Sequence, residues 1–415
     1  MTAQEQTSRE GKKPYVVLVL QGGGALGAYH VGAYQAMQEA GYEPDWVSGI
    51  SIGAVNAALI AGNTSVCRLD KLNRFWKQEI SRNDGWGEIL TGQVRRWFNT
   101  MSVGEAVLFG LPNFFLPRIP NPFFCPPWID GGTSVYDTNP LRDTLERLVD
   151  FELINARHIR LSLGATRVVT GELVFFDNTS DRIGPEHVLA SGALPPGFPA
   201  AKVNDDLYWD GGCVSNTPLE TILDHENELG EHTLVFMIDL WNAKGTAPRS
   251  MDEVLWRQKQ IQYASRTAHN IKTVTERHNL RWALGAFAKA AESQNLERQP
   301  DLREAFALLS KNGMPPEARP GRGIPTASEV RIEEYGKRMD IVHLIYEPSE
   351  DQIPQSDAEF SQPSIESRRL AGYADMKQAL AEACWRKTKQ VDLPAVVHTI
   401  QTGPTSVANS SGFPR

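Results

Sequence analysis

The sequence is poor in cysteine and lacks long apolar runs. Only four cysteines occur in 415 residues, far apart and never as a CxxC pair: Cys67, Cys125, Cys213 and Cys384. This spacing fits neither a disulfide framework nor a zinc site, and it indicates a reducing compartment. No stretch approaches the roughly 20 apolar residues that a membrane-spanning helix needs. We therefore expect no metal site, no cofactor and no transmembrane segment.

An excess of positive charge is also lacking. The chain has 42 Lys and Arg against 50 Asp and Glu, a net charge of −8, so nucleic acid is not an expected partner. The first residues are polar, and the apolar run Val16–Leu20 is too short for the core of a signal peptide. We expect a cytoplasmic protein with peripheral membrane contact at most; export by a route without a cleavable signal stays open.

Two strand–turn–helix units stand at the start of the chain. The run YVVLVL leads into a glycine loop and then a helix with Val31, Tyr34 and Met37 at helical spacing. The run DWVSGI leads into a turn at Ser51 and a second helix. Such units predict an α/β fold of three layers, with a mostly parallel sheet flanked by helices. Further strands are expected at 159–166, 173–176, 233–240 and 341–347.

The glycine loop allows three interpretations. As Gly22-x-Gly24-x-x-Gly27 it matches the dinucleotide-binding fingerprint, with Glu43 and Asp45 roughly where a ribose-binding acid is expected. Its backbone N–H groups at a helix start would equally suit the oxyanion of an acyl-transfer reaction. A tight structural turn is the third interpretation, and the spacing alone does not separate the three.

A second motif favours the oxyanion interpretation. The segment Gly49-Ile50-Ser51-Ile52-Gly53 is a GxSxG between a short strand and a helix, as a nucleophile elbow requires. The two glycines leave room for a sharp turn that exposes the serine hydroxyl, and the helix dipole favours negative charge there. The predicted oxyanion donors are the amides of Gly22, Gly23, Gly24 and Ile52.

An aspartate is the better candidate for the base, because none of the nine histidines has a telling neighbourhood. Asp210 lies in LYWDGGCVSNTPL, where an apolar strand precedes it and Gly211 and Gly212 let the backbone turn. We expect it at the carboxyl end of its strand, where ligands bind in open α/β sheets. The similar Asp130-Gly131-Gly132 lies in a proline-rich stretch and is predicted to be a turn.

Together these motifs resemble the patatin-like phospholipases. The resemblance rests on GGGALG, GISIG and the DGG at 210, in that order, and on Ser191-Gly192-Ala193-Leu194-Pro195, which is similar to the family's S-x-A-x-P segment; it covers about residues 14–240. It implies a Ser51–Asp210 dyad without histidine, an acyl-serine intermediate, and hydrolysis of lipid acyl esters of the phospholipase A or lysophospholipase type.

Other functions stay open beside this one. An esterase acting on another acyl ester, such as a hydroxyalkanoate oligomer, and an acyltransferase would use the same dyad. A dinucleotide-binding protein, or a hydrolase fold kept as a scaffold, would not be an enzyme of this type. An intact serine and aspartate argue against the scaffold.

The expected division of the chain follows its composition. Residues 1–12 form a disordered leader, 13–245 the catalytic domain, 246–390 a helical extension, and 391–415 a disordered tail. Apolar spacing predicts helices around 254–268, 280–291 and 370–383 within the extension, whose strand at 341–347 is a candidate to return to the main sheet.

One segment suggests contact with lipid. Residues 109–128 hold five Phe, one Trp and six Pro, a density of proline that excludes a long helix. Two interpretations stand beside each other: a loop packed over the sheet, which we favour, and an acyl-binding flap or interfacial patch with arginines near the lipid phosphates. The arginines are Arg95, Arg96 and Arg118.

Overall fold

The computed structural model describes residues 13–82, 92–122, 132–225, 228–293, 337–348, 353–387 and 394–400. One sheet of nine strands forms its centre. The strands are β1 (Tyr15–Leu20), β2 (Trp46–Ile50), β5 (Arg160–Arg167), β6 (Leu173–Asp177), β7 (Ala201–Val203), β8 (Asp206–Asp210), β9 (His232–Asp239), β10 (Arg338–Ile345) and β11 (Ala395–Ile400).

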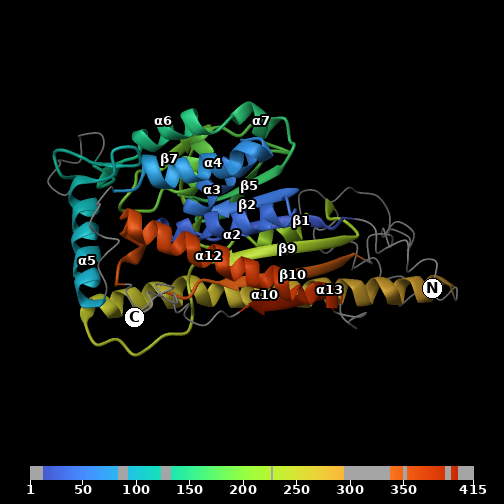
Figure 1. Ribbon diagram of the computed structural model, residues 1–415. Helices are drawn as coiled ribbons and strands as arrows, with labels where there is room; N and C mark the ends of the chain where they lie inside the picture. Colours follow the sequence, from blue (N-terminus) through green and yellow to red (C-terminus); the bar gives the residue numbers. More distant parts are fainter. Residues whose placement is uncertain are drawn as a thin grey trace, which may run out of the picture.

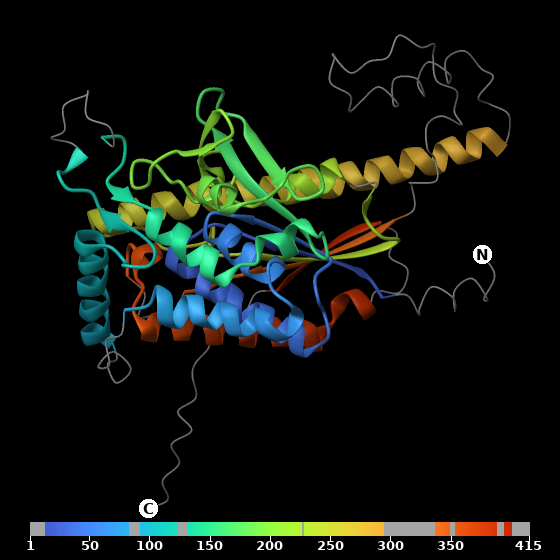
Figure 2. The same cartoon turned by 90° about the horizontal axis from the view of Figure 1, so that it is seen from above.

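The strands lie in the order β11-β10-β9-β1-β2-β5-β8-β7, with β6 also paired to β5. The neighbours from β11 to β5 are parallel, whereas β6 and β8 run antiparallel to β5, and β7 runs antiparallel to β8. Helices cover both faces of the sheet (Figures 1 and 2). The predicted three-layer, mostly parallel α/β fold is confirmed.

The described helices account for the flanking layers, and a small hairpin of β3 (Leu116–Pro117) and β4 (Tyr136–Asp137) stands apart from the sheet. The helices are α2 (Ala28–Glu39), α3 (Ile52–Ala61), α4 (Ser65–Arg74), α5 (Gly92–Phe109), α6 (Asn139–Leu148), α7 (Phe151–Asn155), α8 (Pro185–Ser191), α9 (Glu220–Asp224), α10 (Met251–Ser293), α12 (Gln362–Glu382) and α13 (Cys384–Lys387). None of these is long and apolar enough to cross a bilayer.

The central strands are buried on both faces, and their sequences explain it. The residues of β1 from Val16 to Leu20 have no exposed surface, and β2 is buried throughout. Continuous apolar, β-branched runs are typical of parallel strands that helices cover on both sides. This packing holds the ends of β1 and β2 side by side, where the glycine loop and Ser51 follow.

The later part of the chain joins the same core. β10 pairs with β9 and β11 pairs with β10, so segments from both sides of residue 245 share one sheet. α12 packs on α2 with the two backbones in direct contact. A Cβ at Gly372 would lie 2.0 Å from the carbonyl oxygen of Tyr29, and one at Gly32 would lie 1.8 Å from that of Arg369.

Two expectations for this region need correction. The disordered tail predicted from 391 is wrong for Ala395–Ile400, because this β-branched segment pairs with β10 as an outer strand. The helices predicted around 254–268 and 280–291 are one continuous α10, since no glycine or proline interrupts the chain between them. The helix predicted around 370–383 corresponds to the second half of α12, which ends one residue earlier, at Glu382.

The aromatic segment after α5 packs inward at its first two phenylalanines. Phe114 and Phe115 are 9% and 7% exposed and contact Phe198 edge-on or tilted, with Phe75, Tyr136 and Phe360 completing the cluster. The packed-loop interpretation is therefore right for these two residues, and the interfacial patch is wrong for them. Residues 123–131, including Asp130, lie outside the described part of the chain.

Candidate active site

The register of the sheet brings Ser51 and Asp210 to one level. Ile50, the last residue of β2, pairs with Gly164 of β5, and the next residue of β5, Ala165, pairs with Asp210. Ser51 and Asp210 thus flank β5 from its two sides. Asp210 is the last residue of its strand, as the sequence predicted, and this strand, β8, runs antiparallel to β5.

Ser51 occupies a strained elbow between β2 and α3. Its φ of 57° and ψ of −126° lie where a residue with a side chain is seldom found. The flanking glycines permit this turn. A Cβ at Gly49 would lie 2.4 Å from the carbonyl oxygen of Gly53, and one at Gly53 would lie 2.2 Å from that of Leu20. The GxSxG spacing is therefore a packing requirement of this turn.

A hydrogen-bond relay holds the elbow in place. The N–H of Ser51 donates to both the carbonyl oxygen and the hydroxyl of Ser191, each at 3.1 Å. The hydroxyl of Ser191 in turn donates to the carbonyl of Gly164 at 2.6 Å. The segment from Ser191 to Pro195 noted in the sequence thus begins by anchoring Ser51 to β5.

Asp210 is buried beside the serine hydroxyl. It is 2% exposed, its Oδ1 accepts the N–H of Gly212 at 2.7 Å, and the Ser51 side chain lies close enough to lower the pKa of its carboxyl group. Burial raises the pKa of Asp210 from 3.8 to about 6, although Ser51 and the hydrogen bond from Gly212 act in the opposite direction. A carboxylate with such a pKa is a stronger base than an exposed aspartate.

The glycine loop offers fewer donors than predicted. The N–H of Gly22 already donates to the carbonyl of Asn216 at 3.2 Å, so Gly22 is wrong as an oxyanion donor. Asn216 also donates its side-chain amide to the carbonyl of Gly22 at 2.8 Å. Within the described residues, no acceptor pairs with the N–H groups of Gly23, Gly24 or Ile52.

Other motif glycines keep these loops close together. A Cβ at Gly27 would lie 2.8 Å from the side chain of Ile52, and one at Gly211 would lie 2.7 Å from the carbonyl oxygen of Gly164. Asn216 was not predicted from the sequence: it lies six positions after Asp210 and joins the aspartate loop to the glycine loop. A polar residue just after the DGG was the available signal.

Three buried ionisable side chains in this part of the molecule are held neutral. Burial and the nearby Asp210 raise the pKa of the Cys213 thiol to about 11 and that of Tyr263, on α10, to about 12. Burial lowers the pKa of His30 to about 3, and this ring contacts the amide of Asn56. Among the described residues, no histidine bonds Ser51 or Asp210.

The acids of the dinucleotide interpretation lie elsewhere. Asp45 precedes β2, at the end of this strand remote from Ser51, and its Oδ2 accepts the N–H of Val16 at 2.8 Å. Glu43 pairs with Arg68 at 2.5 Å. A ribose acid would have to lie near the glycine loop at the other end of the strands, so the structure does not support that interpretation.

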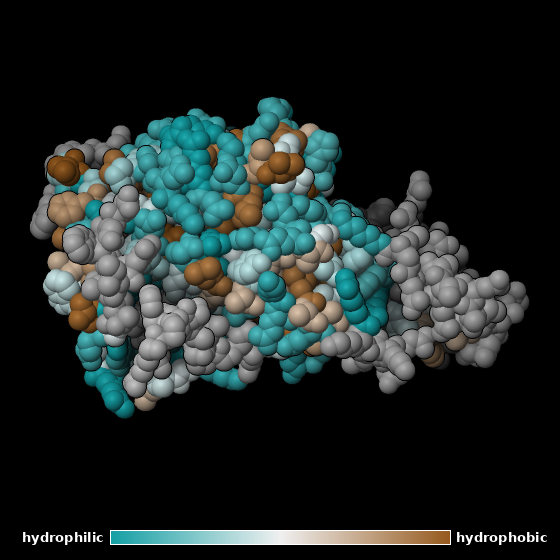
Figure 3. Space-filling view, viewed as in Figure 1, coloured by the Kyte–Doolittle hydropathy of each residue, from teal (hydrophilic) through white to brown (hydrophobic). Residues whose placement is uncertain are grey.

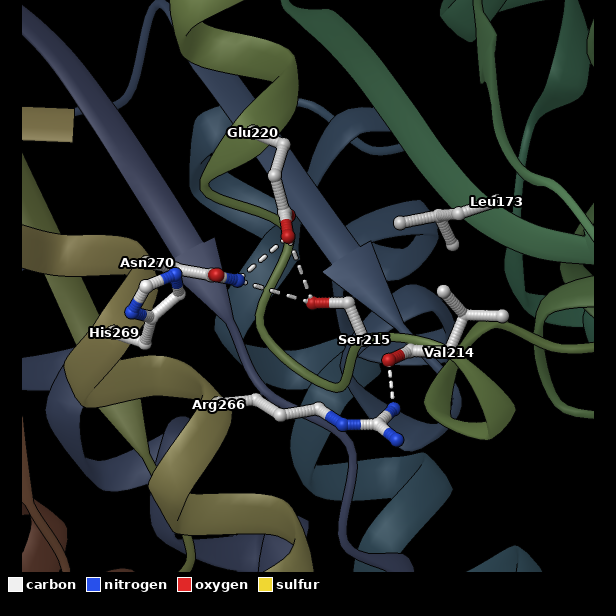
Figure 4. A pocket seen from close by; sticks show the side chains of 7 residues that line it. All are labelled: Leu173, Val214, Ser215, Glu220, Arg266, His269 and Asn270. Atoms are coloured by element: carbon white, nitrogen blue, oxygen red, sulfur yellow. Dashed lines mark hydrogen bonds between the residues drawn. The ribbon is translucent and has the colours of Figure 1, made fainter. Parts of the chain in front are cut away.

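A cavity of about 300 Å³ lies between the segment after Asp210 and α10 (Figure 4). On its floor, Ser215 and Asn270 both donate to Glu220, and Arg266 donates to the carbonyl of Val214. His269 and Leu173 complete its lining. Neither Ser51 nor Asp210 lines this cavity, so it is separate from the dyad.

The raised pKa of Asp210 gives a test of its predicted role as base. If ionised Asp210 accepts the serine proton, kcat/KM for a neutral soluble ester should rise as pH increases through about 6 and then level off. A pH–rate profile between about pH 4 and 8 measures this midpoint. A midpoint at the ordinary aspartate value of 3.8 would contradict the assignment of the base.

Comparison with known proteins shows which families this sequence resembles. A family model for patatin-like phospholipases matches residues 18–223, and a second one, described as patatin phospholipase, matches residues 290–392. Neuropathy target esterase sws of Drosophila sechellia and of Drosophila melanogaster are each 42% identical over 65 residues. These matches span 16% of this chain but only 4% and 5% of those proteins.

Two solved structures are similar at lower identity. VipD from Legionella pneumophila is 16% identical with a TM-score of 0.33, covering 88% of this chain and 67% of VipD. Full-length ExoU with SpcU from Pseudomonas aeruginosa is 14% identical with a TM-score of 0.26, covering 91% of this chain and 80% of that chain.

Since the glycine loop, the serine elbow and the aspartate loop all lie within the match to the first family model, this chain belongs to the patatin-like phospholipase family.

Proposed function

We propose that this protein is a serine acyl-ester hydrolase that acts on lipids through Ser51 and Asp210. The observation that carries the proposal is the position of Ser51, at a strained elbow beside the buried carboxyl group of Asp210 and next to backbone N–H groups without an acceptor. A hydroxyl needs an adjacent base to become a nucleophile, and this carboxylate is the base beside it. Membership in the family supports the lipid substrate.

The reaction proceeds in two halves. Asp210 takes the proton of Ser51 as Oγ attacks the ester carbonyl, and the amides of Gly23, Gly24 and Ile52 are the proposed donors to the oxyanion. The tetrahedral intermediate then collapses, and protonated Asp210 gives its proton to the leaving alcohol. Water attacks the acyl-serine with Asp210 again as base, which releases the fatty acid and restores the hydroxyl.

Oxyanion stabilisation has to supply much of the rate enhancement. Even with a pKa raised to about 6, Asp210 is no stronger a base than imidazole, so removal of the serine proton stays costly. A single oxyanion donor contributes roughly 2.7–4 kcal/mol to lowering the barrier in a well-studied protease. The start of α3 adds a favourable dipole at Ile52.

The proposed substrate is a phospholipid or lysophospholipid at a membrane surface, and the proposed location is the cytoplasm with peripheral contact to that surface. An acyltransferase would share every step up to the acyl-serine and would then pass the acyl group to an alcohol in place of water. A lipidomic comparison of cells carrying the parent enzyme or Ser51→Ala identifies the substrate class and separates the two reactions by their products.

A fluorophosphonate probe tests the nucleophile directly. We expect the parent protein to be labelled on Ser51, with Ser51→Ala unlabelled, because the probe reacts only with an activated serine. Peptide mass spectrometry locates the label, and Ser180→Ala, a change of an exposed serine in a turn, serves as the matched control. A folded parent protein that does not react would overturn the proposal.

A further inference from the structure

Helix α5 buries polar side chains and exposes apolar ones, the reverse of an ordinary surface helix. Its inward face carries Arg95, Asn99, Ser102 and Ala106, at helical spacing of four, three and four, and all four residues are buried. The guanidinium of Arg95 reaches the hydroxyl of Ser364 at 3.3 Å and the side chain of Asn99 at 3.1 Å. A surface helix normally buries its apolar face and exposes its polar one.

The outward face of α5 is apolar. Trp97 is 66% exposed, Leu108 68% and Phe109 66%, and Val94 and Met101 are more than half exposed. Val94, Trp97, Met101 and Leu108 recur at spacings of three, four and seven, which places them on one stripe of the helix.

The segment after the helix extends this surface with Leu116 and with Ile119, which is 93% exposed. Figure 3 shows apolar side chains along this end of the molecule. We call these exposed apolar residues the α5 face: Val94, Trp97, Met101, Leu108, Phe109, Leu116 and Ile119. Single exposed apolar residues are ordinary on a protein surface, but a continuous stripe of this kind marks a surface that contacts an apolar partner.

The α5 face lies at the same end of the sheet as the dyad. α5 contacts the 3₁₀ turn η10 (Ser356–Ala358), and η10 contacts η1 (Gly24–Gly27) of the glycine loop. A Cβ at Gly24 would lie 2.3 Å from the carbonyl oxygen of Asp357, so this turn lies directly against the loop. In Figures 1 and 2, α5 stands beside the first turns of α10. The chain reaches α10 from the carboxyl end of β9, so this is the end of the sheet at which the parallel strands finish.

We propose that the α5 face docks the enzyme on a lipid surface by inserting apolar side chains among the headgroups. The proposal rests on the proposed function, because a lipid hydrolase must draw its substrate from such a surface. Trp, Phe and Leu on one face of a helix are typical of interfacial binding, and Trp favours the headgroup level. A second copy of the chain is the competing occupant.

Charge indicates how this docking works. The chain carries a net charge of −8, so an anionic membrane repels the protein as a whole. Arg96 is an exposed cation on α5, but one cation does not offset this charge. Insertion of apolar side chains is therefore the main attraction. Binding to zwitterionic phosphatidylcholine should persist at high salt, where screening removes electrostatic attraction.

The test uses Ser51→Ala protein, so that binding is measured without turnover. We expect this protein to sediment with phosphatidylcholine vesicles, and the added changes Trp97→Ser, Leu108→Ser and Phe109→Ser to lower its partition coefficient at least about tenfold. Val66→Ser is the matched control: Val66 is 89% exposed on α4, remote from Ser51, and its change should leave binding as it was.

The same three changes in the active enzyme should leave hydrolysis of a soluble short-chain ester within about twofold, because none of these side chains touches the dyad. Vesicle binding that is unchanged by the three changes, or absent from the Ser51→Ala protein, overturns the docking proposal. So does a parent dimer that the three changes convert to monomer without weakening vesicle binding. If the parent protein, without any of these changes, is not labelled by the fluorophosphonate probe, the proposed function is overturned instead.

Discussion

Replacing Asp210 with asparagine is expected to remove nearly all ester hydrolysis and yet leave the protein folded. Asparagine keeps the shape of the side chain and an oxygen that accepts the N–H of Gly212. It cannot take the proton of Ser51, and loss of a general base costs about 10²–10⁴ in rate. Ser51→Ala removes the proposed nucleophile and should abolish hydrolysis and labelling together.

The same substitution should not lower stability near neutral pH. Folding raises the pKa of Asp210 from 3.8 to about 6, so the folded state binds this proton more tightly than the unfolded state does. Below about pH 4 the proton is bound in both states; as pH rises through 6 that stabilisation is lost and the buried carboxylate costs about 3 kcal/mol. Asparagine carries no charge and avoids this cost.

Steady-state assays of a soluble ester, with thermal unfolding at pH 7 to 8, measure both effects. Asp206→Asn is the matched control: Asp206 lies at the other end of β8, where its exposed carboxylate pairs with Arg167 at 3.3 Å. This control should retain activity, since surface ion pairs contribute little. An Asp210→Asn enzyme of normal activity would refute the dyad.

Replacing Gly372 with alanine is expected to destabilise the protein severely. The new Cβ would lie 2.0 Å from the backbone carbonyl oxygen of Tyr29, which no side-chain rotation can relieve. α2 and α12 would have to separate, and α2 follows directly from the glycine loop. Overpacking typically costs about 1–3 kcal/mol, and a clash between two backbones belongs at or above the top of that range.

Gly104→Ala provides the contrast within the same chemistry. Gly104 lies inside α5, and a Cβ there meets nothing within 4 Å. Its free energy of unfolding should rise by up to about 1 kcal/mol, the difference in helix propensity between the two residues. Urea unfolding of both variants measures the difference. Equal stability of the two variants would mean that α12 is not packed on α2 as described.

Turn chemistry was the part of the site that local sequence revealed. The elbow at Ser51 depends on glycines two residues away on each side, and the turn after Asp210 depends on the two glycines that follow it. Continuous apolar runs likewise indicated the buried strands. Each of these signals lies within a few residues of the feature it predicts.

Features that depend on distant partners were missed. The N–H of Gly22 donates to the carbonyl of Asn216, nearly two hundred positions away, and nothing in the glycine motif predicts this hydrogen bond. Ala395–Ile400 forms a strand because β10 offers it an edge. Phe114 and Phe115 look like a membrane patch in sequence, yet a cluster of distant rings buries them, while α5 beside them turns its apolar stripe outward.

By itself, the sequence determined the α/β architecture, the serine turn and the aspartate turn, because backbone sterics and strand burial are local or repeat along the chain. The tertiary structure alone decided that Ser51 and Asp210 meet, through the antiparallel pairing of β8 with β5. It also decided the pKa of the carboxyl group and which amides stay free. Register, burial and hydrogen-bond partners come from segments far apart in the chain, so no local pattern contains them.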